Sequence, residues 1–137
     1  MVSQKKPAGI RVLVACDREL YRDSMAALVR NCDDLLLLDK RSQGEENAPY
    51  VMRMAPDILI LGVDPEEDCA DHARLYRSIF DGPIIGFAFH DDQRLEYEQA
   101  GIERVVDGAI DVAKLKSLAT ELTGKKSRRS ARRRTSV

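Results

Sequence analysis

The chain has 137 residues, of which 44% are apolar and 33% charged, a composition typical of one globular domain. No apolar run approaches the roughly 20 residues that a membrane-spanning helix needs, and no apolar stretch of a secretory signal follows the first lysines. The three cysteines, Cys16, Cys32 and Cys69, have neither metal-ligand nor redox-pair spacing. We therefore expect reduced thiols and a cytoplasmic location.

Five strand patterns alternate along the chain with five helix patterns. The strands, short apolar and β-branched runs, are predicted over 10–16, 34–40, 56–63, 83–89 and 102–108. The helices are predicted over 18–31, 44–55, 65–80, 92–101 and 111–124. Pro49 is expected in the first turn of its helix or at a kink.

Residues that start or stop helices support these boundaries. Asp17 and Asp111 are interpreted as N-caps, and Pro65 is expected near the first position of its helix. Gly101 is expected just past the end of the fourth helix, and Gly124 at the end of the fifth.

Alternating strands and helices predict an α/β fold, a doubly wound five-stranded parallel sheet with helices on both faces. The flavodoxin-like strand order 2-1-3-4-5 suits this length, and function is then expected beyond the carboxyl ends of the strands. The domain is predicted over 8–124, after a flexible N-terminus over 1–7. Residues 125–137 show no apolar periodicity, so we expect a disordered tail.

Four segments of the sequence carry a resemblance to a known family. They are RVLVACDRELYRDSMAALV, APDILILGVDP, PIIGFAFHDD and AGIERVVDGAIDVAKLKSLATEL. These segments, within roughly residues 10–123, resemble the CheY-like receiver domains of bacterial response regulators, and most of all the branch that usually precedes a helix-turn-helix domain. In that family two acids and an acceptor aspartate hold Mg²⁺, while a hydroxyl residue and a lysine bind the phosphoryl oxygens.

The resemblance implies that this chain has lost most of that pocket. The acid pair corresponds to Cys16 and Asp17, the acceptor to Gly62, the hydroxyl residue to Ala88, and the lysine to Asp107 or Gly108. Four of the five required groups are absent, and one remaining acid is a poor Mg²⁺ site. Asp17 is therefore interpreted as an N-cap or surface acid, and no metal, cofactor or phosphorylation is expected.

Other polar residues give no stronger chemistry. Asp64, two residues past the acceptor position, lacks the paired acids, the hydroxyl and the lysine. The run from His90 to Asp92 is interpreted as a helix start, and His72 has no partner that the sequence identifies. Because no Ser-His-Asp pattern, P-loop or GxGxxG motif is present, we predict that the protein is not an enzyme.

The net charge of −1 conceals a strong asymmetry. Seven of the 22 basic residues and no acid lie in the tail, which leaves 15 basic against 23 acidic residues in 1–124, a net charge of −8 against +7. The seven are Lys125, Lys126, Arg128, Arg129, Arg132, Arg133 and Arg134. The segment could solubilise the chain, bind nucleic acid nonspecifically, or bind a membrane surface or an acidic protein.

The tail is also similar in layout to the arginine-rich extension with which some CheY-like proteins bind cyclic di-GMP. Guanidinium groups pair with phosphates and read guanine edges, so this alternative is chemically sound. The main prediction is a stand-alone receiver-like domain that docks to a signalling protein, or to a second copy, without phosphorylation. The resemblance places the docking face within 92–100, 103–107 and 111–122. Only 13 residues follow the fifth helix, too few for a helix-turn-helix domain.

Overall fold

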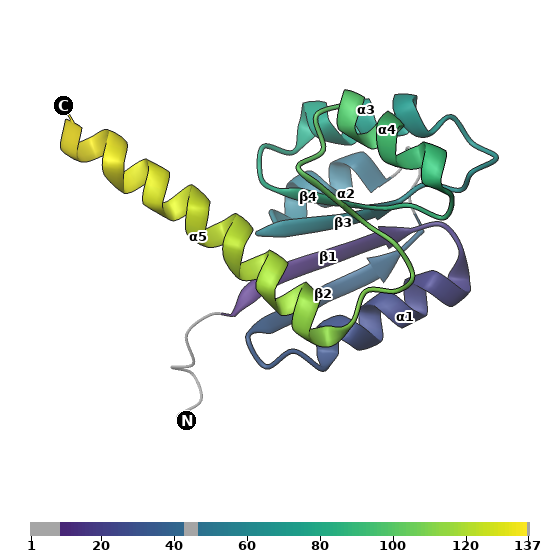
Figure 1. Ribbon diagram of the computed structural model, residues 1–137, viewed down its shortest axis with the longest axis horizontal. Helices are drawn as coiled ribbons and strands as arrows, with labels where there is room; N and C mark the ends of the chain where they lie inside the picture. Colours follow the sequence, from purple (N-terminus) through teal and green to yellow (C-terminus); the bar gives the residue numbers. More distant parts are fainter. Residues whose placement is uncertain (1–8, 43–46, 137) are drawn as a thin grey trace.

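The computed structural model describes residues 9–42 and 47–136, with side chains up to residue 124. Its centre is a parallel sheet of five strands in the order β2-β1-β3-β4-β5, which confirms the predicted architecture (Figure 1). The strands are β1 Ile10–Cys16, β2 Leu35–Arg41, β3 Ile58–Gly62, β4 Ile84–Phe87 and β5 Arg104–Val106. The helices are α1 Glu19–Arg30, α2 Asn47–Met54, α3 Cys69–Ile79, α4 Asp91–Gln99 and α5 Val112–Ser136.

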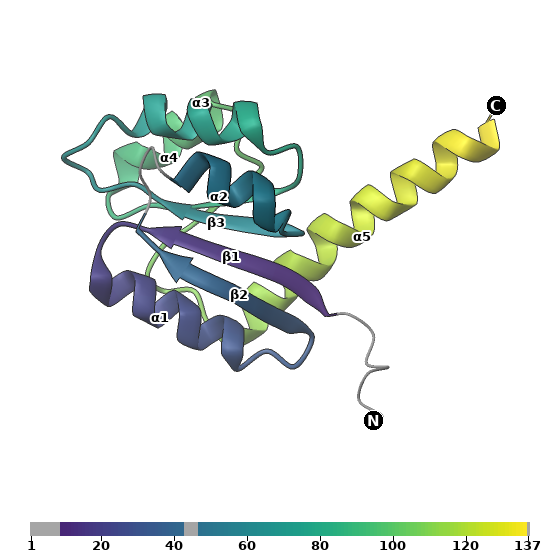
Figure 2. The same ribbon diagram turned by 180° about the vertical axis from the view of Figure 1, so that it is seen from behind.

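Both faces of the sheet are covered by helices, as the strand composition predicts. Helices α1 and α5 lie on one face, and α2, α3 and α4 on the other (Figures 1 and 2). Side chains alternate along the strands, so each face has its own core cluster. The cluster under α1 and α5 takes Val12, Val14, Ile58 and Ile60 from the central strands. The cluster under α2, α3 and α4 takes Leu13, Ala15, Leu59 and Leu61.

Three of the helix-terminal predictions are confirmed. Gly101 follows the last turn of α4 with a φ of 87°, a left-handed conformation that glycine adopts without strain. The Asp111 carboxylate accepts a hydrogen bond of 2.8 Å from the amide of Lys114, so it caps α5. Pro49 lies in the first turn of α2, where its missing N–H costs little.

Two predicted helix starts are wrong. The N-cap position of α1 is Arg18, which makes no side-chain capping bond, and the Asp17 carboxylate accepts from the amide of Asp64 instead of capping the helix. Helix α3 begins at Cys69, four residues after Pro65, and its N-cap is Asp68, which accepts from Asp71 N at 3.1 Å. The residues before Asp68 form a turn instead of a helix, because the Asp64 carbonyl accepts a hydrogen bond from Glu67 N at 2.8 Å.

Helix α5 continues past Gly124, where the sequence predicted its end, and projects beyond the sheet (Figures 1 and 2). Gly124 does not take a left-handed conformation, and the lysine, arginine and alanine residues after it favour helix. The side chains of 125–137 lie outside the described residues, so the predictions of disorder and ligand binding there stay predictions. The predicted flexible N-terminus, 1–7, also lies outside them. No helix within the described residues is long and apolar enough to cross a membrane.

Candidate functional site

The carboxyl ends of β1 and β3 bring together the first two residues of the expected pocket. Cys16 and Gly62 are direct neighbours in adjacent strands, and Cys16 is fully buried. A Cβ atom added to Gly62 would lie 2.5 Å from the Cys16 Sγ. The thiol therefore fills the space in which a side chain at the acceptor position would have to begin.

The Cys16 thiol is also chemically quiet. Burial, followed by the charge of the neighbouring Asp17, raises the pKa of Cys16 to about 12. A thiol needs to ionise before it attacks an electrophile or binds a metal ion. The side chain that the resemblance assigns to the first acid position is thus a small neutral packing residue at physiological pH.

The ends of β4 and β5 supply neither the hydroxyl nor the cation of a receiver pocket. Ala88 is buried in the core cluster on the α4 side, and its amide donates to the Val106 carbonyl at 2.8 Å. Asp107 accepts from the amide of Ala109 at 3.0 Å and lies 3.9 Å from the Arg94 guanidinium. Of the two residues to which the resemblance assigns the lysine, Asp107 is thus an acid that supports a turn, and Gly108 has no side chain.

Asp17 has a structural task that the sequence did not indicate. Its Oδ2 accepts a hydrogen bond of 2.7 Å from the amide of Asp64, and its own amide donates to the Gly62 carbonyl at 2.8 Å. These two bonds fasten the loop after β1 to the loop after β3. The carboxylate that the resemblance placed in a metal site thus accepts a hydrogen bond from a backbone amide.

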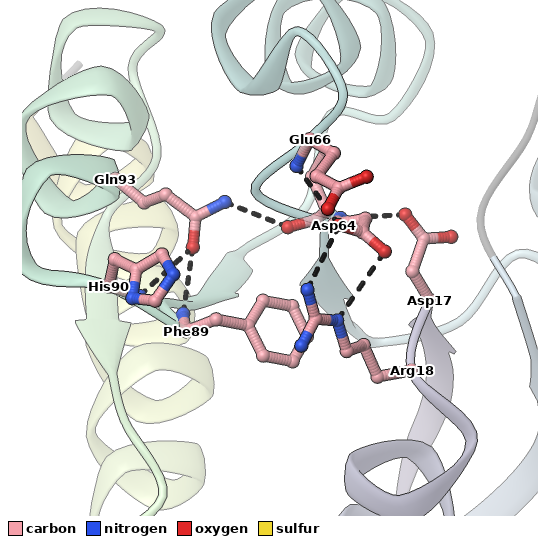
Figure 3. Close-up of polar contacts among 8 residues, drawn as sticks. Asp17, Arg18, Asp64, Glu66, Phe89, His90 and Gln93 are labelled. Atoms are coloured by element: carbon pink, nitrogen blue, oxygen red, sulfur yellow. Dashed lines mark hydrogen bonds and ion pairs between the residues drawn. The ribbon is translucent and has the colours of Figure 1, made fainter.

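Arg18 and Asp64 form an ion pair over the same strand ends (Figure 3). The guanidinium donates from Nε to Oδ2 at 3.4 Å and from Nη2 to Oδ1 at 3.2 Å. A hydrogen bond from the Glu66 amide and the Arg18 guanidinium together lower the pKa of Asp64. Asp64 is therefore an ionised carboxylate with its partners already in place. Sequence reasoning missed this pair because its members are 46 positions apart.

Aromatic side chains occupy the rest of this edge. The rings of Tyr21, Phe87 and Phe89 pack with centroids 5.0 to 5.3 Å apart. The guanidinium of Arg18 lies 5.4 Å from the centre of the Phe89 ring. Phe87 and Phe89 were interpreted as strand residues alone. A spacing of two residues places both rings on the same face of a strand. This spacing was the signal in the sequence from which their contact could have been predicted.

Two α4 residues reach the loop after β3 from the other side. Gln93 donates from Nε2 to the Val63 carbonyl at 2.8 Å and accepts from the Phe89 amide at 2.7 Å (Figure 3). The Tyr97 hydroxyl accepts from the Val63 amide at 3.0 Å and donates to the Phe87 carbonyl at 2.9 Å. Neither residue was singled out from the sequence, since a glutamine and a tyrosine inside a polar helix give no specific pattern.

The histidines have structural settings. His90 occupies the N-cap position of α4, as expected, and its amide bonds the Gln93 side chain at 3.3 Å. His72 on α3 lies 3.6 Å from Glu67. Within the described part of the chain, no group of three or more His, Cys, Asp or Glu side chains is arranged to hold a metal ion.

Comparisons with known proteins identify the fold. No protein-family profile and no curated protein matches the chain. Solved structures do match, among them three that are similar over 85% of this chain. One is a two-component response regulator of the LuxR family from Aurantimonas, with a TM-score of 0.70, 19% identity and 86% of that chain covered.

The other two are receiver domains. The receiver of a modulated diguanylate cyclase from Desulfovibrio desulfuricans has a TM-score of 0.71, 16% identity and 95% of its chain covered. The receiver of the sensor histidine kinase PA1611 from Pseudomonas aeruginosa has a TM-score of 0.69, 20% identity and 99% covered, and holds magnesium in its active-site cleft. At these identities the likeness shows a CheY-like receiver fold and nothing finer.

Proposed function

We propose that this protein is a receiver-fold interaction module of bacterial signal transduction that works without phosphoryl transfer. The observation that carries the proposal is the packing of Cys16 against Gly62, because the thiol leaves no room for an acceptor side chain. The electrostatics agree with it. The resemblance assigns the lysine to Asp107 or Gly108, and neither side chain is a cation, so the phosphate and a carboxylate would approach each other unscreened.

The one carboxylate that could replace the acceptor is already engaged. Asp64 is paired with Arg18 and accepts from the Glu66 amide at 2.9 Å. A nucleophilic carboxylate must have a free oxygen directed at phosphorus with a metal ion beside it, and both Asp64 oxygens are bonded within the protein. The support for an interaction role is thus a receiver fold whose strand-end groups bond one another.

The family resemblance places the docking face on α4, β5 and α5, and the described residues of this surface include charged side chains and the large exposed apolar side chain of Leu95. Leu95 on α4 is 58% exposed, and Arg104 of β5 forms an ion pair with Glu121 of α5. A partner signalling protein or a second copy of the chain is the proposed occupant of that face. The identity of the partner does not follow from these residues.

The test is incubation with acetyl phosphate and Mg²⁺, followed by intact mass measurement. The expected result is an unchanged mass, while a receiver with an intact acceptor aspartate, treated in parallel, gains one labile phosphoryl group. A phosphoryl gain on this chain would overturn the proposal. In that case the Asp64→Asn variant would show whether Asp64 carries the phosphate.

The basic segment at the end of the chain supports a second candidate, an effector that binds cyclic di-GMP. Its seven positive charges in 13 residues would pair with the two phosphates of such a ligand. Isothermal titration of cyclic di-GMP into the full chain, and into a full-length variant with the five tail arginines changed to glutamine, tests it. Heat that is lost in the variant supports the ligand. Binding of DNA instead, with a steep salt dependence, would support nonspecific nucleic-acid attraction.

A further inference from the structure

Three consecutive residues at the end of β3, Gly62 to Asp64, are bonded alternately to the loop after β1 and to α4. The Gly62 carbonyl accepts from the Asp17 amide, and the Asp64 amide donates to the Asp17 carboxylate, at 2.8 and 2.7 Å. Between them, Val63 turns both of its backbone polar groups toward α4. Its amide donates to the Tyr97 hydroxyl and its carbonyl accepts from the Gln93 amide group, at 3.0 and 2.8 Å.

The contacts on the α4 side are shielded from water. Gln93 is 3% exposed and Tyr97 is fully buried, and a spacing of four residues puts them on one face of the helix. The Tyr97 ring also packs on Gly86 of β4, where an added Cβ would lie 2.8 Å from the ring. Losing either bond would leave a buried polar group of Val63 without a partner, which costs more than an exposed bond does.

Arg18 completes a closed ring of contacts (Figure 3). Its guanidinium pairs with Asp64, the residue after Val63, and also lies over the Phe89 ring at 5.4 Å. The Phe89 amide donates to the same Gln93 side chain that bonds Val63. The ring therefore runs from Arg18 through Asp64, Val63, Gln93 and Phe89 back to Arg18. Arg18 is connected to α4 by two routes, one through backbone and one through an aromatic ring.

We propose that this ring is one cooperative clamp that couples the loop after β1 to the position of α4. While the Arg18–Asp64 pair is closed, the clamp fixes the helix that carries Leu95 on its outer surface. A partner that binds α4 in this position stabilises the Arg18–Asp64 pair, and disruption of the pair weakens that partner's binding by the same factor. The consequence for partner binding rests on the proposed function, whereas the coupling itself concerns the domain alone.

The first experiment removes a hydrogen-bonding group from α4 and measures the effect on the loop after β3 and on Asp64, the partner of Arg18. Gln93→Leu removes the amide of Gln93 but keeps the bulk, and Gln99→Leu, on an exposed position of the same helix, is the matched control. Hydrogen exchange by NMR is expected to speed up about tenfold or more at the Val63 and Phe89 amides in Gln93→Leu alone. The pKa of Asp64, measured by carboxyl carbon NMR, is expected to rise toward its ordinary value in the same variant, because its partner Arg18 is less firmly held.

The second experiment runs in the opposite direction. Arg18→Ala is expected to speed up exchange at Val63 and through α4, although the hydrogen bonds of the Arg18 guanidinium go to Asp64. Arg104→Ala is the matched control because it breaks an ion pair of similar side-chain exposure, 39% and 42% against 43% and 31%, outside the ring. Tyr97→Phe, which keeps the ring on Gly86 and removes only the hydroxyl, replaces Gln93→Leu if that variant does not fold.

The coupling is contradicted if Arg18→Ala changes exchange only at residues 64–66, or if the Asp64 pKa is the same in Gln93→Leu and Gln99→Leu. These readouts involve neither phosphate nor a partner. If the protein is phosphorylated and the clamp is intact, only the proposed function is contradicted. If the protein is not phosphorylated and the coupling is absent, only the clamp is contradicted.

Discussion

At the scale of single residues, the packing of Cys16 against Gly62 defines the site as much as its charges do. Gly62 and Cys16 lie opposite each other in β3 and β1, and the thiol sits where a Gly62 side chain would begin. The side chain at each position therefore limits the size of the side chain that the other position can hold. A side chain could not be placed at Gly62 by a single change without displacing Cys16.

We predict that Gly62→Ala lowers the free energy of unfolding by about 1–3 kcal/mol, because the new methyl group overpacks against Cys16. The same change made in a Cys16→Ala background is expected to cost much less, since the obstructing sulfur is gone. Urea unfolding of the four proteins in this double-mutant cycle measures the coupling. An equal cost in both backgrounds would show that Cys16 does not set the limit.

The buried thiols give a second prediction, in pH dependence. Burial is the main cause that raises the pKa of both Cys16 and Cys69 from 9.0 to about 12, so the folded state keeps these thiols neutral where the unfolded chain ionises them. Below pH 9 the contribution to stability is fully present, and it is lost as pH rises from about 9 to about 12.

Denaturation at pH 8 to 11 should therefore show stability falling with pH, and a Cys16→Ala, Cys69→Ala double variant should show a shallower fall. At neutral pH, a thiol reagent such as Ellman's reagent should label neither cysteine until the protein unfolds. Rapid labelling of the folded chain at neutral pH would contradict the burial of these thiols.

At the scale of elements, the ends of α4 decide how the helix meets the sheet. Its first turn is tied to the loop after β3 through Gln93, and its last turn is closed by Gly101 in a left-handed conformation. Gly124 in α5 has no such conformation and no neighbour that an added Cβ would meet within 4 Å. The two glycines therefore respond in opposite ways to the same substitution.

Gly101→Ala is expected to destabilise the protein by about 1 kcal/mol, because a side chain strains the left-handed backbone. Gly124→Ala is expected to leave stability unchanged or to raise it by up to about 1 kcal/mol, since alanine favours helix. Thermal unfolding of both variants beside the parent protein measures the difference. A loss of stability in Gly124→Ala equal to that in Gly101→Ala would contradict the continuous helix at Gly124.

At the scale of the whole molecule, charge is divided between an acidic domain and a basic segment. Residues 1–124 carry a net charge of −8, and residues 125–137 carry +7. A tethered segment experiences its own domain at a high effective concentration, on the order of millimolar. Individual exposed ion pairs are weak, about 1 kcal/mol or less, so contact between the two would depend on ionic strength.

We predict that the basic segment contacts the acidic domain at low salt and releases it when the Debye length falls to about 8 Å at physiological ionic strength. Amide spectra of the full chain and of a variant with the five tail arginines changed to glutamine should then differ at low salt and converge at high salt. Superimposable spectra of the domain at low salt would mean that the two do not touch. An anionic ligand would compete for the same arginines.

The alternation of strands and helices was decided within single segments of sequence. Apolar runs such as ILIL before Gly62, with helical patterns between them, carry the period of each element locally, and right-handed crossovers leave few ways to arrange five such units. The ends that were predicted correctly, at Gly101 and Asp111, depend on the conformation or the capping bond of the residue itself. The residue types at the positions that the resemblance assigns to the acceptor and the lysine were equally visible, because a residue type is a property of one position.

What the tertiary structure decided are contacts between residues far apart in the chain. The carboxylate of Asp17 had two uses, as a helix cap or as an acceptor for the Asp64 amide, and only the approach of the two loops selected the second. The Arg18–Asp64 pair, the thiol against Gly62 and the reach of Gln93 to Val63 arise in the same way. Local sequence fixes periodicity and capping, whereas a bond across the strand ends exists only after parallel pairing has placed those ends at one edge of the sheet.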